Sequence, residues 1–451
     1  MTLRFGTDGI RGVANVELTP ELALAVGRAA ARRLAGDAFL VGSDTRRSSP
    51  MLKAALAAGL AAEGRRVVDV DVLPTPGLAF LAASRAVPAA MVSASHNPFD
   101  DNGIKLLSSA GTKLPDAEER DVEEELEAIM AGERRPAEPV LGARVGSIAA
   151  DGRGLEEYAA HLAGSVDLRR APRLAVVCDC ANGAASTLAP QVLRSVGLAV
   201  HAVAAEPNGT NINDGCGSTH PERLAAEVVA RRADLGLAFD GDADRLIAVD
   251  HLGQVVDGDQ LLALFALDLH RRGELASNGV VVTVMSNLGL RIALEAAGIT
   301  VVETPVGDRY VADALDEHGF VLGGEQSGHI VFRRQATTGD GILTALRLVD
   351  LLARERRPLA ELAAAAMVRL PQELRSVRVL APSRLSEAAG VWREVEAVEA
   401  RLGAHGRVVL RASGTEPAVR VMVEAGTHEL ARSCAEHLAA VVARELGVAR
   451  R

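Results

Sequence analysis

The chain has few aromatic residues: its 451 positions hold one Trp, two Tyr and eight Phe. Proteins that bind single-stranded nucleic acid stack the bases on aromatic side chains, so this scarcity argues against such a surface. The net charge of −10 argues the same way, because a protein that binds the phosphate backbone needs a basic face. We therefore expect no nucleic-acid partner, and any anionic ligand must meet positive charge that is gathered locally.

Cysteines are also few, and they follow no pattern. The four of them form no Cys-x-x-Cys pair and no disulfide framework, which fits a reducing compartment. Long apolar runs are missing as well, since none reaches the ~18 residues of a membrane span. The chain starts directly on a glycine-rich segment and leaves no room for a signal peptide. We expect a cytoplasmic protein with no membrane partner.

The remaining composition, 48% hydrophobic and 24% charged, is typical of a globular protein. Apolar, β-branched segments alternate with helical segments, and this pattern begins again near Leu174 and near Gly279. Residues 116–153 predict a charged helix and a connector, and shorter elements follow residue 370. We predict an α/β fold with three similar mixed-sheet domains and a smaller C-terminal α+β domain around a central cleft. The predicted domains are residues 1–153, 154–254, 255–369 and 370–451.

Three carboxylates, those of Asp240, Asp242 and Asp244, lie between two apolar runs. Such runs predict buried strands, and carboxylates crowded at a strand end repel one another unless a hard cation such as Mg²⁺ or Ca²⁺ neutralises them. A calcium EF-hand is excluded, because its sixth and twelfth positions need Gly and Glu where this chain has Arg245 and His251. A solvated acidic turn is the plainer alternative. We predict a site for a hard cation.

A second polar loop holds Ser95 and His96, after the apolar run 89–92 and before Lys105. A serine at the end of a strand can be a nucleophile if a neighbouring group activates it, and both His96 and Lys105 are near in sequence. The segment lacks the G-x-S-x-G turn of α/β-hydrolases, which disfavours acyl transfer. An ordinary polar loop remains the alternative for this segment.

Two further regions are rich in groups that bind sugars and phosphates. Glycines surround Glu325, Ser327 and His329, and carboxylate and hydroxyl groups among glycines can bracket sugar hydroxyls. The loop that ends at Arg309 is of the same kind. In the last domain, a basic segment offers forked donors and open backbone N–H groups to a phosphate, although surface turns of this composition are common. Its residues are Arg411, Ser413, Gly414, Thr415 and Arg420.

Each of these loops follows a strand, and an α/β sheet forms its ligand crevice at that end of its strands. One loop from each domain could therefore line a single cleft. The cleft would hold a nucleophilic serine, a cation site, a hydroxyl-binding loop and a phosphate clamp. That set is typical of phosphoryl transfer on a phosphosugar.

With these motifs in order along nearly the whole chain, the sequence resembles the α-D-phosphohexomutase family. The motifs are Phe5-Gly-Thr-Asp-Gly-Ile-Arg-Gly12, Ser93-Ala-Ser-His-Asn-Pro98, Asp240-Gly-Asp-Ala-Asp-Arg245, Gly324-Glu-Gln-Ser-Gly-His329 and Arg411-Ala-Ser-Gly-Thr-Glu-Pro417. The first, second and fourth resemble the members that act on glucosamine phosphates more than those that act on mannose and glucose phosphates.

The resemblance implies a role for each candidate residue. It implies that Ser95 is the phosphorylated serine and that the three aspartates and a phosphoserine oxygen hold one Mg²⁺ per subunit. Lys105 and Arg11 are then neighbours that offset the remaining negative charge, and either Lys105 or His329 is the general acid/base. The implied substrate-binding residues are Glu325 and Ser327 at the sugar hydroxyls, Arg309, and Arg411, Ser413, Gly414, Thr415 and Arg420 at the non-reacting phosphate.

The resemblance also implies an activity. The expected enzyme is a mutase that interconverts glucosamine 6-phosphate and glucosamine 1-phosphate through a sugar 1,6-bisphosphate, which is also its activator. It would supply UDP-N-acetylglucosamine and cell-wall precursors, with a phosphosugar as its partner and a monomer or homodimer as its assembly. Two alternatives stay open: activity on mannose and glucose phosphates, and a Mg²⁺-dependent phosphatase that releases inorganic phosphate.

Overall fold

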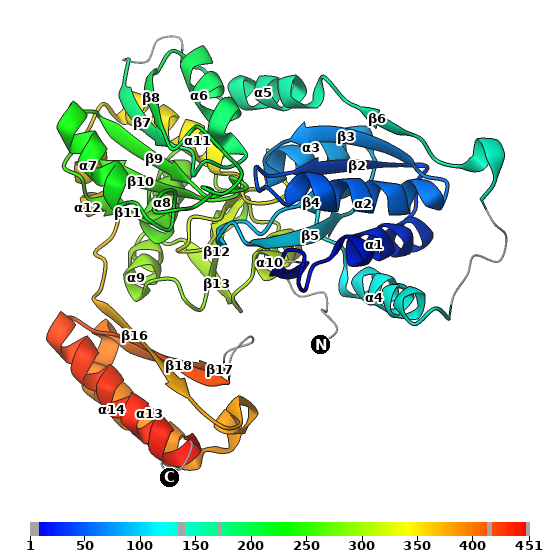
Figure 1. The fold of residues 1–451 in the computed structure, drawn as a ribbon. Coiled ribbons are helices and arrows are strands. Elements are labelled where there is room, and N and C mark those ends of the chain that lie inside the picture. The colour runs from blue at the N-terminus through cyan, green and yellow to red at the C-terminus, as the bar shows by residue number, and fades with distance from the viewer. Residues whose placement is uncertain (1–8, 134–139, 169–172, 413–416, 448–451) are drawn as a thin grey trace.

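The structure, a computed structural model, describes residues 9–133, 140–168, 173–412 and 417–447. These residues form four sheets that follow one another along the chain, each with helices packed beside it (Figure 1). The fourth sheet and its two helices lie apart from the other three units (Figure 1). Short 3-10 helices occur at Gly142–Arg144, Ala276–Asn278, Pro382–Glu387 and Gly403–His405.

The first sheet has six strands in the order β1-β5-β4-β2-β3-β6. Strands β2, β3, β4 and β6 run parallel, whereas β5 runs antiparallel to β4 and β1. Helix α1 begins at Pro20, because Thr19 caps it by accepting the N–H of Leu22 and Pro20 fills its first turn. The elements are β1 Ile10–Val13, α1 Pro20–Arg33, β2 Ala38–Ser43, α2 Ser49–Ala62, β3 Arg66–Val72, α3 Thr75–Arg85, β4 Ala89–Val92, β5 Asp101–Leu107, α4 Asp116–Met130 and β6 Ile148–Ala150.

Strand β6 lies in the segment that the sequence predicts to be a connector. It pairs with β3 in parallel and forms the edge of the first sheet. All three of its residues are exposed. No alternation of buried and exposed side chains therefore marks it as a strand in the sequence.

The second sheet has the order β11-β10-β9-β7-β8. Strand β7 is parallel to β8 and β9, and β10 returns antiparallel to β9. Every residue of β9 and β10 is buried, as expected for the two apolar runs that flank Asp240, Asp242 and Asp244. The elements are α5 Gly154–Gly164, β7 Ala175–Asp179, α6 Ala185–Ser195, β8 Ala199–Val203, α7 Glu222–Arg231, β9 Leu235–Phe239, β10 Leu246–Asp250 and β11 Val255–Val256.

The third sheet has the order β13-β12-β14-β15, with β12 parallel to β13 and β14, and with β15 antiparallel to β14. Helix α8 begins with a capping box between Asp257 and Gln260. The elements are α8 Gly258–Arg271, β12 Gly279–Thr283, α9 Leu288–Ala296, β13 Thr300–Thr304, α10 Asp308–His318, β14 Leu322–Gly324, β15 Ile330–Phe332, α11 Gly341–Glu355 and α12 Leu359–Ala366.

The fourth sheet is small and antiparallel, in the order β16-β18-β17. Its elements are β16 Gln372–Arg378, α13 Ala389–Leu402, β17 Arg407–Ala412, β18 Ala418–Glu424 and α14 His428–Leu446. Three mixed α/β units and a smaller C-terminal α+β unit confirm the predicted fold class. The predicted boundaries near residues 153, 254 and 369 stay predictions.

One continuous core joins the first three units, since Leu40, Leu237 and Val280 belong to the same cluster of buried side chains. The fourth unit has a separate core, to which Val421 and Leu438 belong. In the described ranges, no helix combines the length and the apolar composition that crossing a membrane requires. The first three units are thus tied together by apolar packing that the fourth does not share.

Polar contacts join the fourth unit to the third. Glu424, fully buried on β18, accepts the N–H of Leu288 over 3.1 Å and the Nε–H of Arg407 over 2.6 Å. Asn287 exchanges two hydrogen bonds with the backbone of Leu370, over 2.9 and 3.0 Å. The hydrogen bonds of Asn287 and Glu424, which we call the Asn287 corner, therefore hold the fourth unit to the third.

Asp259 lies next to this corner and makes stability depend on pH. It is fully buried, and its Oδ2 accepts the N–H of Asn287 over 2.7 Å. Burial, followed by the charge of Asp257, raises the pKa of Asp259 to about 7. The folded protein therefore holds this proton more tightly than the unfolded chain, so its contribution to stability is complete at low pH and is lost as the pH rises through about 7.

We expect Asp259→Asn to flatten this dependence, because asparagine keeps an acceptor oxygen and carries no charge. Between about pH 5 and pH 8, the melting temperature of the unchanged protein should fall relative to that of the variant, which should be the more stable of the two at the upper end. Thermal unfolding of both proteins across that range measures the difference. Parallel curves would contradict the burial of a titrating carboxyl at this corner.

Candidate active site

The three aspartates lie on the turn between β9 and β10, residues 240–245, which we call the acidic turn. They are almost completely buried. The exposed fractions of Asp240, Asp242 and Asp244 are 0%, 0% and 5%. One carboxylate oxygen from each lies within 4.8 Å of the others. Ala243, between the last two, adopts a left-handed φ of 57°. The sequence prediction of three carboxylates crowded at a strand end is confirmed by this turn.

A hard cation fits this set of carboxylates. Burial, followed by the charges of Asp244 and Asp242, raises the pKa of Asp240 well above its usual value. The Oδ1 atoms of Asp242 and Asp244 are buried, and among the described residues they have no hydrogen-bond partner. Buried carboxylate oxygens without partners are costly, and a divalent cation coordinated by oxygen atoms would give them one. These residues can therefore hold a metal ion.

Ser95 faces this turn from the loop between β4 and β5, residues 93–100, which we call the serine loop. Its hydroxyl donates a hydrogen bond to Oδ2 of Asp240 over 2.6 Å. The residue is 1% exposed and has a φ of 50°, in the left-handed region that residues other than glycine rarely adopt. Backbone strain of this kind is concentrated at active sites. The structure thus brings the predicted nucleophile, from the first sheet, to the predicted cation site, from the second.

Lys105 and Thr75 bind the middle carboxylate of the turn. Lys105, on β5, places its Nζ 3.0 Å from Oδ2 of Asp242 and 4.0 Å from Oδ2 of Asp244. Thr75, the first residue of α3, donates its hydroxyl hydrogen to the same oxygen of Asp242 over 2.6 Å. Thr75 is not among the predicted site residues, although a Thr-Pro helix start directly after a strand is a signal for one.

His96 also lies beside Ser95. Nδ1 of His96 is 3.3 Å from the hydroxyl oxygen of Ser95. Burial, followed by the positive charges of Arg245 and Arg11, lowers the pKa of His96 to about 4. The ring is therefore neutral near neutral pH, and the charges of Arg245 and Arg11 disfavour its protonation. Local positive charge gathers here although the whole chain is acidic.

His329 is 2% exposed and lies against the third aspartate. Its Nε2 accepts the backbone N–H of Gly339 over 3.0 Å, so this nitrogen carries no proton. Its Nδ1, which then bears the hydrogen, lies 3.6 Å from Oδ2 of Asp244. Nε2 is thus engaged by the backbone, and Nδ1 faces Asp244.

Two glycines allow the loops to meet. A side chain at Gly241 would collide with the carbonyl oxygen of Ser95, so the acidic turn needs glycine to touch the serine loop. A side chain at Gly328, whose φ is 92°, would collide with the backbone of Leu246 at the start of β10. The acidic turn is therefore packed between the serine loop on one side and the loop that carries His329 on the other.

Glu325 and Ser327 lie on the turn between β14 and β15, which is the strand end that the sequence predicts. Oε1 of Glu325 accepts the N–H of Gly307 over 3.1 Å, and the Ser327 hydroxyl lies 3.4 Å from Oε2 of the same glutamate. Both side chains are half-buried. Their polar atoms are thus ordered next to the acidic turn and partly open to solvent.

A cavity of about 240 Å³ lies between the first and third units, and Lys105, Asp244 and Arg309 are among the residues that line it. Arg309 pairs with Asp116 and, over 3.2 Å, with Glu119, both of α4. The charge of Arg309 is therefore offset by these two carboxylates and by Asp313, 3.8 Å away.

The described part of the predicted phosphate clamp lies on the fourth sheet, away from the acidic turn. Arg411 on β17 and Arg420 on β18 are cross-strand partners. Burial, followed by the charge of Arg420, lowers the pKa of Arg411, as expected for two cations held side by side. Ser413, Gly414 and Thr415 lie outside the described residues.

Comparison with protein families gives four consecutive matches along the chain. All four are to the phosphoglucomutase/phosphomannomutase family: alpha/beta/alpha domain I at residues 2–133, domain II at 156–253, domain III at 257–370 and the C-terminal domain at 368–441. The order of these domains is the order of the four sheets.

Individual proteins give closer matches. The chain is 52% identical, over the full length of both chains, to a phosphoglucosamine mutase from Frankia casuarinae. It is also 52% identical to a phosphoglucosamine mutase from Rubrobacter xylanophilus, over 99% of this chain and 98% of that one. Among solved structures, a phosphoglucomutase/phosphomannomutase family protein from Burkholderia thailandensis matches with a TM-score of 0.80 and 26% identity, over 98% of this chain and 97% of that one.

Proposed function

The chain belongs to the phosphoglucomutase/phosphomannomutase family, and we propose that it interconverts glucosamine 6-phosphate and glucosamine 1-phosphate. Two relatives named for that reaction are each 52% identical to this chain over nearly their full length. This identity supports glucosamine phosphate as the substrate. The observation that carries the chemistry is the 2.6 Å contact between the Ser95 hydroxyl and Asp240. It sets a nucleophile against a site that fits a divalent cation.

The cofactor is proposed to be Mg²⁺, held by Asp240, Asp242, Asp244 and an oxygen of phosphorylated Ser95. Small hard cations prefer oxygen ligands, and the three carboxylates supply them, two of their oxygens having no hydrogen-bond partner among the described residues. When bound, this ion would polarise the phosphoryl group that is transferred. Sugar 1,6-bisphosphate is the proposed activator, because it can phosphorylate a free Ser95.

The reaction divides into two transfers by the same serine. In the first, the O1 hydroxyl of glucosamine 6-phosphate attacks the phosphorus of phosphoserine; the bond from phosphorus to Oγ breaks, and a 1,6-bisphosphate forms. In the second, Oγ attacks the phosphorus at O6, and glucosamine 1-phosphate leaves. In the first transfer the O1 hydroxyl loses a proton and the departing Oγ of Ser95 takes one up; in the second, Oγ loses a proton and the departing O6 takes one up, so phosphoryl groups and protons balance.

Lys105 is the better candidate for moving that proton. Its Nζ lies in the cavity wall and 3.0 Å from Asp242, so it is close to the reacting oxygens. His329 accepts the Gly339 N–H at Nε2, and its Nδ1 faces Asp244. We therefore assign His329 the task of orienting Asp244, and Lys105 the task of general acid/base. Arg11 would offset negative charge beside Ser95.

The substrate is proposed to be held at both ends. The position of Glu325 and Ser327 beside the acidic turn supports contact with the sugar hydroxyls, and Arg309 lines the neighbouring cavity. Paired Arg411 and Arg420 would bind the non-reacting phosphate with Ser413, Gly414 and Thr415. Because the bisphosphate presents a phosphate at either end, one clamp serves both transfers.

Kinetic comparison of three substrates tests this proposal. The Mg²⁺-loaded protein, with a trace of sugar 1,6-bisphosphate, should act on glucosamine 6-phosphate with a kcat/KM at least ~10-fold above that on mannose 6-phosphate or glucose 6-phosphate, as expected if one or two contacts decide the sugar. Phosphorus NMR should detect the 1-phosphate and no excess of inorganic phosphate. Preference for mannose or glucose phosphate would contradict the proposed substrate, and release of inorganic phosphate would identify a phosphatase.

A further inference from the structure

The backbone of Ser95 is held on both sides by buried polar groups. Its N–H donates to the hydroxyl oxygen of Ser93 over 3.0 Å. Its carbonyl oxygen accepts two hydrogen bonds, from Nη2 of Arg46 over 2.8 Å and from Nδ2 of Asn213 over 2.9 Å. A carbonyl oxygen has two lone pairs, so both are used. The N–H and both lone pairs of the carbonyl oxygen of Ser95 are therefore all hydrogen-bonded.

Arg46 is 1% exposed, and its guanidinium is turned toward the serine loop. Besides the bond to Ser95, Nη1 donates to the carbonyl oxygens of Asn97 and Pro98 over 3.1 and 2.8 Å, and Nη2 donates to Asn97 over 3.0 Å. The fork of one side chain thus binds three carbonyl oxygens of the segment 95–98. A planar, always-charged group with donors on both sides is suited to this task, and a lysine is not.

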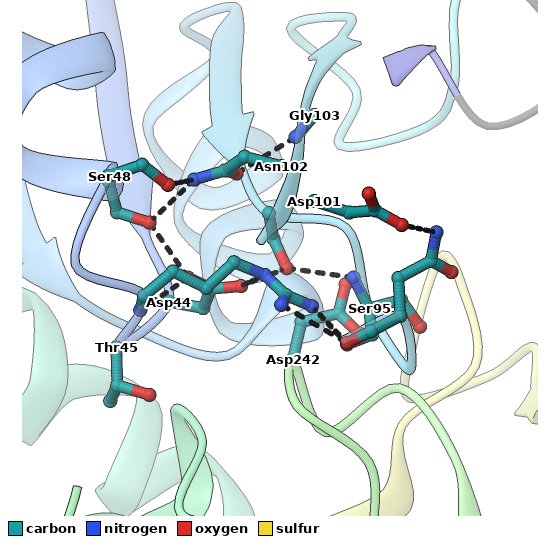
Figure 2. Close-up of polar contacts among 12 residues, drawn as sticks. Asp44, Thr45, Ser48, Ser95, Asp101, Asn102, Gly103 and Asp242 are labelled. Atoms are coloured by element: carbon teal, nitrogen blue, oxygen red, sulfur yellow. Dashed lines mark hydrogen bonds and ion pairs between the residues drawn. The ribbon is translucent and has the colours of Figure 1, made fainter. Parts of the chain in front are cut away.

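Asp44 completes the frame around the serine loop (Figure 2). Its Oδ2 lies 2.9 Å from Nε of Arg46 and accepts the Ser93 hydroxyl hydrogen over 2.7 Å. Its Oδ1 accepts the Ser49 hydroxyl hydrogen over 2.8 Å. One buried carboxylate therefore orients both the arginine that binds the Ser95 carbonyl and the serine that binds the Ser95 N–H.

Asn213 reaches the same carbonyl from the second unit. It lies in the segment between β8 and α7, and its Nδ2 also donates to the carbonyl oxygen of Asn97 over 3.0 Å. Its backbone N–H is tied to the carbonyl of Ala181, after β7, over 2.9 Å. Besides the contact between Ser95 and Asp240, this amide therefore connects the second unit to the backbone of the serine loop.

We propose that Arg46 and Asn213 are positioning residues, which hold the left-handed backbone of Ser95 so that its hydroxyl faces the acidic turn. Ser95 and the aspartates belong to different units; Arg46 holds the Ser95 carbonyl from the first unit, and Asn213 holds it from the second. Neither is a catalytic residue, since each binds backbone carbonyls. The inference rests on the proposed function, because it concerns Ser95 as the carrier of the phosphoryl group.

Three variants test the proposal. Asn213→Ala removes the second-unit donor, Asn213→Asp keeps its shape but replaces the donor with an acceptor, and Arg46→Lys keeps the charge but loses the fork. Arg47→Ala is the matched control, because Arg47 is exposed and its backbone N–H bond to Gly209 survives the change. For each protein we would measure kcat, KM for glucosamine 6-phosphate, melting temperature and the rate of Ser95 phosphorylation by glucosamine 1,6-bisphosphate, read by intact mass.

We expect kcat and the phosphorylation rate to fall by about 10- to 100-fold in the three variants, as for a reacting group misplaced by a fraction of a bond length. The KM should stay within about 2-fold, because the substrate is bound elsewhere, and Arg47→Ala should match the unchanged protein. A kcat that stays normal in folded Asn213→Ala would overturn the proposal. The proposal would also be overturned if kcat fell only in proportion to the loss of folded protein, because that result indicates a merely structural role.

The outcomes separate this inference from the proposed function. If the unchanged protein neither isomerises glucosamine 6-phosphate nor becomes phosphorylated, the proposed function fails. If the unchanged protein does both and the variants behave like it, the positioning role alone fails. Should Arg46→Lys not fold, the two Asn213 variants decide, because they leave the Asp44–Arg46 pair in place.

Discussion

Replacing Ser95 with alanine will lower kcat by at least ~10³-fold, because it removes the only atom proposed to carry the phosphoryl group between the two ends of the sugar. The hydroxyl is the group that faces the acidic turn, 2.6 Å from Asp240. Alanine is smaller and apolar, so it fits the buried position without a clash. The measurement is the initial rate of glucosamine 1-phosphate formation with saturating substrate and Mg²⁺.

Ser84→Ala is the matched control for this change. Ser84 is an exposed residue of α3 in the same unit, and its hydroxyl donates only to the carbonyl oxygen of Leu81, over 3.2 Å. It should keep the kcat and melting temperature of the unchanged protein. If Ser95→Ala kept more than about a tenth of the activity, another group would have to carry the phosphoryl, and the two-transfer mechanism would be wrong.

The second large effect is that of Asp240→Asn, which we expect to change activity and stability in opposite directions. It removes one of three buried carboxylates that repel one another, so the metal-free variant should melt at a higher temperature than the metal-free unchanged protein. Asparagine keeps one acceptor oxygen, so it retains one of the two hydrogen bonds that Asp240 accepts, from Ser95 at Oδ2 and from the N–H of Arg245 at Oδ1. Activity should nevertheless fall by at least ~10²-fold, because the cation loses a charged ligand.

Thermal unfolding with and without Mg²⁺, together with kcat, checks this prediction. Added Mg²⁺ should raise the melting temperature of the unchanged protein clearly and that of the variant much less. The control is Asp234→Asn, an exposed aspartate just before β9 whose substitution changes the net charge equally. Equal stabilisation of Asp240→Asn and the unchanged protein by Mg²⁺ would show that the ion is bound somewhere else.

The sequence was sufficient for the acidic turn and the serine loop because each is a short polar segment between two apolar strands. The runs 235–239 and 246–249 predict β9 and β10. The turn between them must therefore lie at the carboxyl end of β9. The run 89–92 predicts β4 in the same way, which puts Ser95 at a strand end. Strong local patterns thus predicted where the chemistry is located.

The supporting residues follow no local pattern. Arg46 and Asn213 meet at the carbonyl of Ser95 from positions 49 and 118 residues away, and only the packing of two sheets brings them together. The choice between Lys105 and His329 likewise depends on one long-range fact, the N–H of Gly339 that points at Nε2 of the histidine. Spacing and periodicity along the chain carry no information on such contacts.

The measurement that tests the account most directly is the site of phosphorylation after the protein is incubated with Mg²⁺ and glucosamine 1,6-bisphosphate. Peptide mass spectrometry should find one phosphoryl group, on Ser95, and its loss when excess glucosamine 6-phosphate is added should accompany formation of the bisphosphate. No phosphoryl group on Ser95 in protein that is turning over substrate, or a phosphoryl group that is released only to water, would contradict the central claim.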